Sequence, residues 1–422
     1  MNRSEGIYNE VEQTSPEARK AYQLEKLQAV IKTAMDGSKE FQARMEEAGI
    51  AADSITSLDD FARIPILRKK ELVSIQQDKG LDWLLTATQG ELSRIYQSPG
   101  PIYDPEGREK DYWGWTEGFY AAGFRPGDLV QMTFSYHLTP AGLMLEEPLR
   151  EIGCAVIPAG PGNTPAQMQL MTSLPVTGFV GMTSYLRVIA EKAAKAGLDL
   201  KKDFNLDVAF VAAERLPESL RKEVEEAFDM QIRQGYGTAD VGCIAYECPE
   251  LGGMHLSSRC YVEICDPVTG APLPVGEVGE VVVTPYTLSY PLVRFATGDL
   301  SRMVETPCAC GRTSAKLEGI LGRADDTAKV KGQFIYPSQV AEVVATFPQI
   351  VKHQIVITNE GGRDLLTLKI QLDPTAKATF DEHDFIPAFQ EKAKLRPALH
   401  ILDESEIIEE GSPALVDSRT YE

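Results

Sequence analysis

Apolar residues recur along the chain with two spacings, one typical of helices and one typical of buried strands. Residues 16–49 are rich in Ala, Glu, Lys, Gln and Leu and have no proline after Pro16, so this stretch predicts helix. Between residues 128 and 240, short apolar runs alternate with helical patterns. We expect strands in DLVQMTF, CAVIPAG, TGFVG and DVAFVAA, and helices near 140–152, 164–173, 184–197 and 217–228. This alternation indicates parallel β-α-β units.

The pattern changes in the second half of the chain. Residues 260–284 contain two β-rich runs separated by Pro- and Gly-rich turns, which predict antiparallel strands. After Gly322, strands in KVKGQFIYP, HQIVIT and LLTLKIQL mix with helices near 337–346 and 381–394. We therefore predict an α/β protein with a large N-terminal domain, residues 1–321, that includes a β region. A small α+β domain, residues 322–422, follows it.

Composition and charge narrow the class of protein. Apolar residues make up 43% and charged residues 25% of the 422 positions, as in soluble globular proteins. No segment approaches the ~20 apolar residues that a membrane span needs. The first residues do not resemble a secretory signal, so we expect a cytoplasmic protein. The net charge of −20 argues against nucleic acid or an anionic membrane as a partner, but leaves a nucleotide ligand open.

Three segments carry a family resemblance. They are VEICDP with PLPVGEVGEVVVT between residues 262 and 284, ATGDLSRM at 296–303, and GRADDTAKVKG at 322–332. In order and spacing they resemble the C-terminal core of the adenylate-forming superfamily. GRADD followed by KGQFIYPSQV is similar to the phenylacetate–CoA ligase branch in particular. The resemblance covers nearly the whole chain. It implies the adenylate-forming enzyme fold, with an AMP-binding domain and a small mobile domain that pivots at a hinge residue, Asp325.

The resemblance also implies an activity. An AMP-forming acyl-CoA ligase joins a carboxylate to ATP with release of pyrophosphate, and then passes the acyl group from AMP to coenzyme A. Phenylacetate or a related aryl acid is the implied substrate. ATP or AMP, Mg²⁺ and coenzyme A are the implied cofactors, and a homodimer is expected by analogy alone.

Asp299 and the GYGTADVG segment, residues 235–242, carry the implied nucleotide site. By resemblance, Asp299 accepts hydrogen bonds from both ribose hydroxyls, which suits a carboxylate because it offers two acceptors. Tyr236 would stack on adenine and Thr238 would contact phosphate. Glu214, in VAAERLP at the end of a predicted strand, would border the adenine; the alternative is an acid that favours a helix N-terminus. The implied nucleotide-binding set is Glu214, Tyr236, Gly237, Thr238, Asp299 and Arg323.

The implied catalytic set is Thr238, Asp240 and His137. Asp240 lies close to the position where the family has a glutamate that binds Mg²⁺, and aspartate offers the same hard oxygen with a shorter reach. The alternative is a solvated turn residue. In FSYHLTPAG, residues 134–142, Tyr136 and His137 would line the acyl pocket. A histidine in an apolar run is also commonly a core residue, and that alternative stays open.

The phosphate loop departs from the family pattern. QSPGPIYDPEG, residues 97–107, keeps Ser98 and Gly100 but lacks the usual threonines and lysine. Its prolines have no N–H to donate to a phosphate. Asp104 and Glu106 are expected to repel triphosphate. We therefore predict a poorer phosphate cradle.

The C-terminus departs as well. EEGSPALVDSRTY places Pro413 or a neighbour where the family has a lysine that contacts the acyl carboxylate and the α-phosphate. Loss of such a group typically costs about 10²–10³ in rate. Lys329 and Lys331 are considered as substitutes. Two alternatives to the ligase follow: an AMP- or acyl-adenylate-binding homologue with altered adenylation, and a zinc-stabilised scaffold without catalysis.

Four residues have the types and spacing of a metal site. Cys248 and His255 lie in CPELGGMH, and Cys308 and Cys310 lie in CACGR. Three thiolates and one imidazole suit tetrahedral Zn²⁺. Both pairs flank the same predicted β region, so they can meet in space. The alternative is a set of buried free thiols with a surface histidine. We predict a closed structural zinc site.

Overall fold

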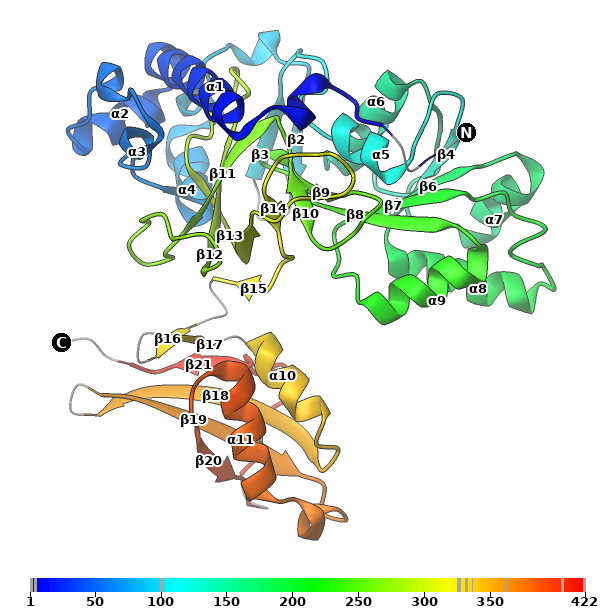
Figure 1. Cartoon of the computed structure of the whole chain (residues 1–422), viewed down its shortest axis with the longest axis vertical. Helices are drawn as coiled ribbons and strands as arrows, with labels where there is room; N and C mark the ends of the chain where they lie inside the picture. Colours follow the sequence, from blue (N-terminus) through cyan, green and yellow to red (C-terminus); the bar gives the residue numbers. More distant parts are fainter. Residues whose placement is uncertain are drawn as a thin grey trace. The chain divides into compact units, whose positions relative to one another are not determined.

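The structure is a computed structural model that describes residue 3 and residues 6–98, 102–324, 328–330, 333–335, 337–360, 363–403 and 406–419. Three residues singled out above, Gly100 of the phosphate loop, Asp325 of the hinge and Lys331, lie outside the described residues. The chain forms two compact units (Figure 1). The first is Met1–Thr297 with Ser301–Gly319, and the second is Gly298–Leu300 with Ile320–Glu422.

The first unit contains the predicted parallel sheet. Its strands lie in the order β5-β4-β6-β7-β8, and each neighbouring pair is parallel. The strands are β4 (Leu129–Met132), β5 (Ala155–Pro158), β6 (Gly178–Gly181), β7 (Val208–Val211) and β8 (Gln231–Thr238). The helices between them are α6 (Ala141–Ile152), α7 (Thr164–Ser173), α8 (Thr183–Lys195) and α9 (Glu218–Phe228). The predicted β-α-β alternation is confirmed.

The same sheet continues through antiparallel strands. β8 pairs antiparallel with β9 (Gly242–Glu247), and β9 with β10 (Met254–Leu256). The path then runs β14-β13-β12-β11, and β15 (Gly322–Arg323) pairs with β13 (Phe295–Val304). The other bounds are β11 (Cys260–Cys265), β12 (Val278–Pro285) and β14 (Lys316–Leu317). β11 and β12 are antiparallel, as residues 260–284 predicted.

The N-terminal part of the chain adds helices and a hairpin to the first unit. The α-helices are α1 (Pro16–Gly37), α2 (Lys39–Glu47), α3 (Leu58–Phe61), α4 (Lys69–Lys79) and α5 (Thr116–Ala122). Strand β1 (Leu67–Arg68) pairs parallel with β13. β2 (Arg94–Ser98) and β3 (Ile102–Glu106) form an antiparallel hairpin. Short 3₁₀ helices lie at Glu10–Gln13, Ala52–Ser54, Leu81–Trp83 and Gln89–Glu91.

The second unit is a small α+β fold. Its main sheet has the order β20-β19-β18-β21, and α10 and α11 cover one face (Figure 1). Phe385 and Phe389 of α11 are fully buried against the sheet residues Ile355 and Leu368. The elements are β16 (Ala328–Val330), β17 (Gln333–Ile335), α10 (Pro337–Ala345), β18 (Ile350–Glu360), β19 (Arg363–Leu372), a 3₁₀ helix (Lys377–Thr379), α11 (Glu382–Ala393), β20 (Ala398–Ile401) and β21 (Leu415–Asp417). Across the residues described, no helix has both the length and the apolarity to cross a membrane.

A buried arginine joins the N-terminal helices to the sheet. Arg294 lies just before β13 and is 2% exposed. Its guanidinium pairs with Glu263 of β11, with Nε···Oε2 3.0 Å, and donates to the carbonyls of Ala62 and Ile64. Breaking a buried pair leaves the partner charge uncompensated, which costs far more than breaking an exposed one.

We predict that Arg294→Met lowers the free energy of unfolding by about 3–5 kcal/mol, because Glu263 then stays buried without its partner. The three tryptophans, residues 83, 113 and 115, all lie in the first unit, so urea unfolding followed by tryptophan fluorescence reports on that unit. Arg302→Met is the control, since the Arg302–Glu318 pair is partly exposed and should cost less than about 1 kcal/mol. Equal effects of the two substitutions would contradict the anchoring role.

Candidate functional site

The end of β8 is shaped by glycines that admit a tryptophan. A Cβ atom on Gly235 would lie 2.6 Å from a ring carbon of Trp115, and one on Gly237 would lie 2.6 Å from another. Side chains therefore do not fit on this face of the strand. Tyr236, between the two glycines, projects from the opposite face because strand residues alternate. Its hydroxyl donates to Thr297 Oγ1 at 3.2 Å.

Thr238 is the last residue of β8, and Asp240 lies in the turn between β8 and β9. Thr238 Oγ1 accepts from the backbone N–H of Val241 at 3.3 Å. The Asp240 side chain is 1% exposed and pairs with Lys69, with Nζ···Oδ2 2.8 Å. Its other oxygen, Oδ1, is buried and has no hydrogen-bond partner among the described residues. Asp240 is thus a buried turn residue, and the solvated alternative is wrong.

Asp104 is a second buried carboxylate whose charge interacts with that of Asp240. The Ser98 hydroxyl donates to Asp104 Oδ2, while Oδ1 is buried without a partner in the described part of the chain. Burial, followed by the negative charge of Asp240, raises the pKa of Asp104 to about 7. Carboxylate oxygens are the ligands that Mg²⁺ prefers. The two unpartnered oxygens therefore fit a magnesium ion in donor type.

The predicted phosphate loop is the β2–β3 hairpin. Ser98 and Ile102 are the last paired residues of the two strands. Glu106 is 2% exposed and accepts hydrogen bonds from Arg94, from the Tyr96 hydroxyl at 2.6 Å and from Trp113 Nε1 at 3.1 Å. Arg94 also pairs with Glu147, and the expected repulsion between Glu106 and triphosphate stays a prediction.

Glu214 binds the start of a helix. It follows Ala213, which has a positive φ of 68°, and accepts from the backbone N–H and the hydroxyl of Ser184, both at 2.7 Å. Ser184 is the second residue of α8, where a carboxylate is favoured by the helix dipole. Glu214 therefore makes the contacts expected of an acid at a helix N-terminus. The helix is α8 and not α9, which follows Glu214 in the sequence.

The two predicted acyl-pocket residues differ in environment. The Tyr136 hydroxyl donates to Glu146 Oε2 of α6 at 2.7 Å, and burial together with this acceptor raises the pKa of Tyr136. His137 is exposed, so it is not a core residue. Its neighbour Leu138 has a positive φ of 62° and is 71% exposed. The acyl-pocket role of both residues stays a prediction.

Asp299 and Arg323 meet within the second unit. They are opposite one another in the β13–β15 pairing, and Arg323 Nη1 donates to Asp299 Oδ1 at 2.9 Å. Gly298 has a positive φ of 78°, and a Cβ there would lie 2.8 Å from Arg323 Nη2. The glycine therefore lets the guanidinium reach the carboxylate. Two residues predicted to bind nucleotide are thus adjacent in space.

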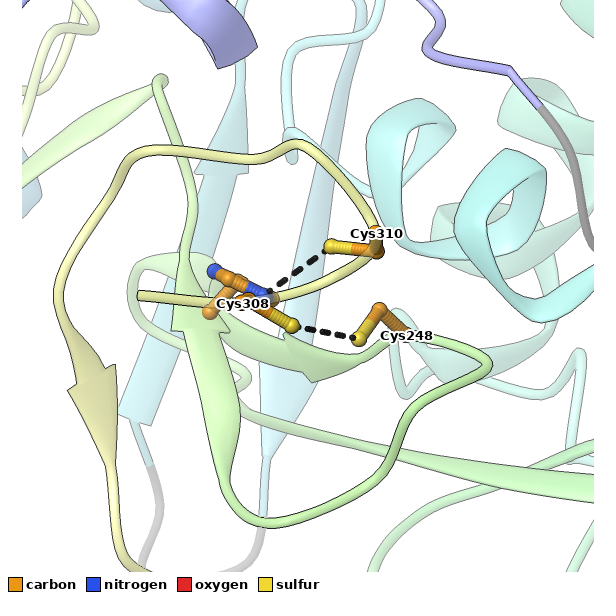
Figure 2. A group of neighbouring side chains, drawn as sticks. Cys248, Cys308 and Cys310 are labelled. Carbon is orange, nitrogen blue, oxygen red and sulfur yellow. Dashed lines mark hydrogen bonds between the residues drawn. The ribbon is translucent and has the colours of Figure 1, made fainter. Parts of the chain in front are cut away.

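The four predicted metal ligands converge, and Figure 2 labels the three cysteines among them. The ligand atoms of Cys248, His255, Cys308 and Cys310 all lie within 4.8 Å of one another. Cys248 Sγ is 3.6 Å from Cys308 Sγ, and Cys310 Sγ is 3.5 Å from His255 Nε2. Hydrogen bonding, chiefly with Cys248, lowers the pKa of the Cys310 thiol.

His255 is oriented toward this cluster by its surroundings. The residue is fully buried on β10, and its Nδ1 lies 3.3 Å from the Ser314 carbonyl oxygen. An N–H at Nδ1 that donates to this carbonyl leaves the Nε2 lone pair for a metal, as is common in zinc sites. The surface-histidine alternative is therefore wrong. The donor set and its geometry fit Zn²⁺.

One residue at the site was missed by the sequence reasoning. Lys69 begins α4, directly after β1, and reaches Asp240 across 171 positions of sequence. Its local sequence, LRKKEL, has no feature that separates it from an ordinary charged helix start. The position of Lys69 beside Asp240 results from the pairing of β1 with β13, and that pairing involves only two residues of β1.

Comparisons with known proteins agree with this architecture. Residues 124–289 match the family of AMP-binding enzymes, and residues 332–414 match the AMP-binding enzyme C-terminal domain. The phenylacetate-coenzyme A ligase of Thermus thermophilus is 31% identical over 376 residues, 86% of this chain and 83% of that protein. That of Escherichia coli K12 is 26% identical over 416 residues, 95% and 93% of the two chains.

Solved structures share the fold. An open conformation of 2-hydroxyisobutyryl-CoA ligase, in complex with 2-HIB-AMP and CoA, superposes with a TM-score of 0.88 at 22% identity, and covers 99% of this chain and 100% of that one. The same enzyme in its postadenylation state gives a TM-score of 0.73 at 24% identity, over 97% and 91% of the two chains. Extended identity to curated relatives and a shared fold lead to one conclusion: the chain belongs to the phenylacetate–CoA ligase family of AMP-binding enzymes.

Proposed function

We propose that this protein is an AMP-forming acyl-CoA ligase for phenylacetate or a related aryl acid. It converts carboxylate, ATP and coenzyme A into acyl-CoA, AMP and pyrophosphate. The observation that carries the proposal is the end of β8 with the turn after it, where Tyr236, Thr238 and Asp240 lie at the carboxyl end of a parallel strand. Ligands of α/β sheets bind at such strand ends.

Residues of β8, of the turn after it and of the β2–β3 hairpin make different contacts during adenylation. Tyr236 stacks on adenine, and its hydroxyl bond to Thr297 holds the ring in place. Thr238 contacts phosphate. Asp240, with Asp104 close by, offers oxygens to Mg²⁺, which when bound neutralises part of the triphosphate charge. Ser98 and Gly100 border the phosphates.

Other residues complete the site by resemblance. Asp299 binds the ribose hydroxyls, with Arg323 holding its carboxylate. Glu214 supports the segment beside the adenine. Tyr136 and His137 line the acyl pocket. Residues 322–422 act as a domain that turns about Asp325 between the two half-reactions and excludes water from each.

The comparisons favour the ligase over the two alternatives, a nucleotide-binding homologue and a scaffold. Relatives named phenylacetate-coenzyme A ligase match along most of the chain. The missing C-terminal lysine bears on the rate of the first half-reaction and not on family membership. A cytoplasmic location and a homodimer stay predictions.

We expect purified protein with ATP, Mg²⁺, coenzyme A and phenylacetate to release AMP, pyrophosphate and acyl-CoA in equal amounts. Reactions without acid, and with an aliphatic acid in its place, are the controls. Coupled pyrophosphate detection and mass spectrometry of the thioester provide the measurement. AMP binding by calorimetry without pyrophosphate release from any aryl acid would support the binding homologue, and absence of both would leave the scaffold.

We predict that Asp299→Asn weakens AMP binding at least about tenfold, because an amide offers one acceptor to a diol where a carboxylate offers two. Calorimetry measures the affinity. Asp364→Asn is the matched control, since Asp364 also pairs with an arginine of the second unit, Arg419, at 3.0 Å. Equal affinities of the two variants would refute the ribose role.

We also propose that Cys248, His255, Cys308 and Cys310 hold a structural Zn²⁺ ion that ties the β13–β14 loop to β9 and β10. Elemental analysis is expected to find one zinc per chain. Cys308→Ser should lose the metal and lower the melting temperature by at least about 5 °C. Cys154→Ser, at a buried thiol outside the cluster, should keep the zinc. A metal-free wild type that melts like Cys308→Ser would rule out the zinc site.

A further inference from the structure

Lys69 is the cation that the structure places at the proposed phosphate site. Its ammonium lies 2.8 Å from Asp240 Oδ2, and its side chain is 39% exposed whereas that of Asp240 is 1% exposed. A buried carboxylate is costly unless a counter-charge holds it. Lys69 therefore has a fixed position, with one side on Asp240 and the other open to solvent.

Three segments converge on this position. β1 pairs parallel with β13, so that Arg68 lies opposite Ala296 and Lys69 follows it. The residue after Ala296 is Thr297, which accepts the hydroxyl bond of Tyr236. Lys69 itself contacts Asp240, four residues beyond Tyr236. The same short pairing therefore brings the lysine to the turn proposed to bind nucleotide.

The neighbouring basic residues serve other partners. Arg68 donates to Glu280 Oε2 at 3.0 Å and to the Pro267 carbonyl at 2.7 Å. Lys70 is exposed and lines a separate cavity of about 840 Å³ beside Glu71 and Ser74. Within LRKKEL, Lys69 is thus the residue that contacts the turn between β8 and β9.

The site needs a cation. Asp104 and Asp240 each have a buried oxygen without a partner in the described region, and an incoming triphosphate adds further negative charge. The family's C-terminal lysine is absent, and Pro413 stands at its place or beside it. Pro413 offers only its carbonyl, which accepts from Gln354 Nε2 at 3.0 Å.

We propose that Lys69 supplies the positive charge that the C-terminal segment lacks during acyl-adenylate formation. This inference rests on the proposed ligase function. A carboxylate oxygen of the acid forms a bond to the α-phosphorus, the bond from that phosphorus to the pyrophosphate oxygen breaks, and pyrophosphate leaves with the electron pair. Lys69 binds the negative oxygens of the α-phosphate and of the acid. No proton is transferred.

A lysine with this role acts in one half-reaction. Adenylation brings the anionic acid against the anionic α-phosphate, whereas thioester formation starts from an acyl-adenylate in which the acid no longer carries a charge, and it breaks the bond between the acyl carbon and the phosphate oxygen. Removing Lys69 should therefore slow adenylation far more than thioester formation. A lysine that serves only to keep Asp240 paired would affect folding and both half-reactions together.

The test compares Lys69→Gln with Lys70→Gln, in the full-length protein. Glutamine keeps a hydrogen-bond donor for Asp240 but removes the charge. ATP–pyrophosphate exchange with phenylacetate should fall about 10²–10³-fold in Lys69→Gln, as for loss of a preorganised electrostatic group. Transfer from synthetic phenylacetyl-adenylate to coenzyme A should change less than about threefold, and thermal melting confirms that each variant is folded. Lys70→Gln should match the wild type in both assays.

Two further variants test whether the charge of Lys69 is what matters and whether another lysine has this role. Lys69→Arg keeps the charge and should exchange at least about ten times faster than Lys69→Gln. Lys352→Gln tests a lysine of the second unit, whose Nζ donates to the Ile408 carbonyl at 2.9 Å in the segment before Pro413. Normal exchange in Lys69→Gln, an equal fall in both half-reactions, or a fall in Lys352→Gln alone would overturn the proposal.

The inference and the ligase proposal can fail separately. If the wild type neither exchanges pyrophosphate nor transfers the acyl group, the ligase proposal fails, and Lys69 is then judged by calorimetry with MgATP. Affinity at least about tenfold weaker in Lys69→Gln than in Lys70→Gln would support the phosphate contact. Unchanged affinity would overturn it.

Discussion

Strand β8 is the constraint on which the rest of the structure depends. It is the last strand of the parallel half of the sheet and the first of the antiparallel half, since it pairs with β7 in one sense and with β9 in the other. Trp115 packs against one face of its end, where Gly235 and Gly237 leave room. The opposite face and the following turn are thereby available for Tyr236, Thr238 and Asp240.

This arrangement buries three carboxylates in the fold. Asp240 is buried in the turn, and Asp104 and Glu106 are buried in the β2–β3 hairpin. The surroundings of each carboxylate differ. Arg94 and two aromatic donors bind Glu106, Lys69 binds Asp240, and the pKa of Asp104 rises to about 7. By resemblance, the phosphate loop and the C-terminal segment each lack a lysine that the family has. In our proposal, Lys69, which pairs with Asp240, supplies positive charge that both segments lack.

Local patterns were sufficient for most of the architecture. The β-α-β alternation and the β11–β12 pair follow from periodicity and turn residues, and the convergence of the three cysteines and one histidine from residue type and spacing. Contacts made by tertiary packing were not predictable in this way. Glu214 binds Ser184, thirty residues earlier, Glu106 acquires Arg94 across a hairpin, and Lys69 reaches Asp240 through a two-residue strand. Nothing within several residues of any of these side chains specifies its partner.

The proposed ligase forms an acyl-adenylate at the end of β8, and the most direct test follows the oxygen of the acid. Phenylacetate labelled with ¹⁸O in both carboxylate oxygens is incubated with the protein, MgATP and coenzyme A, and the AMP is examined by mass spectrometry. The predicted result is one ¹⁸O atom in the phosphate of each AMP formed, because the carboxylate oxygen that attacked the α-phosphorus stays with AMP. AMP without label, or label recovered in inorganic phosphate, would contradict it.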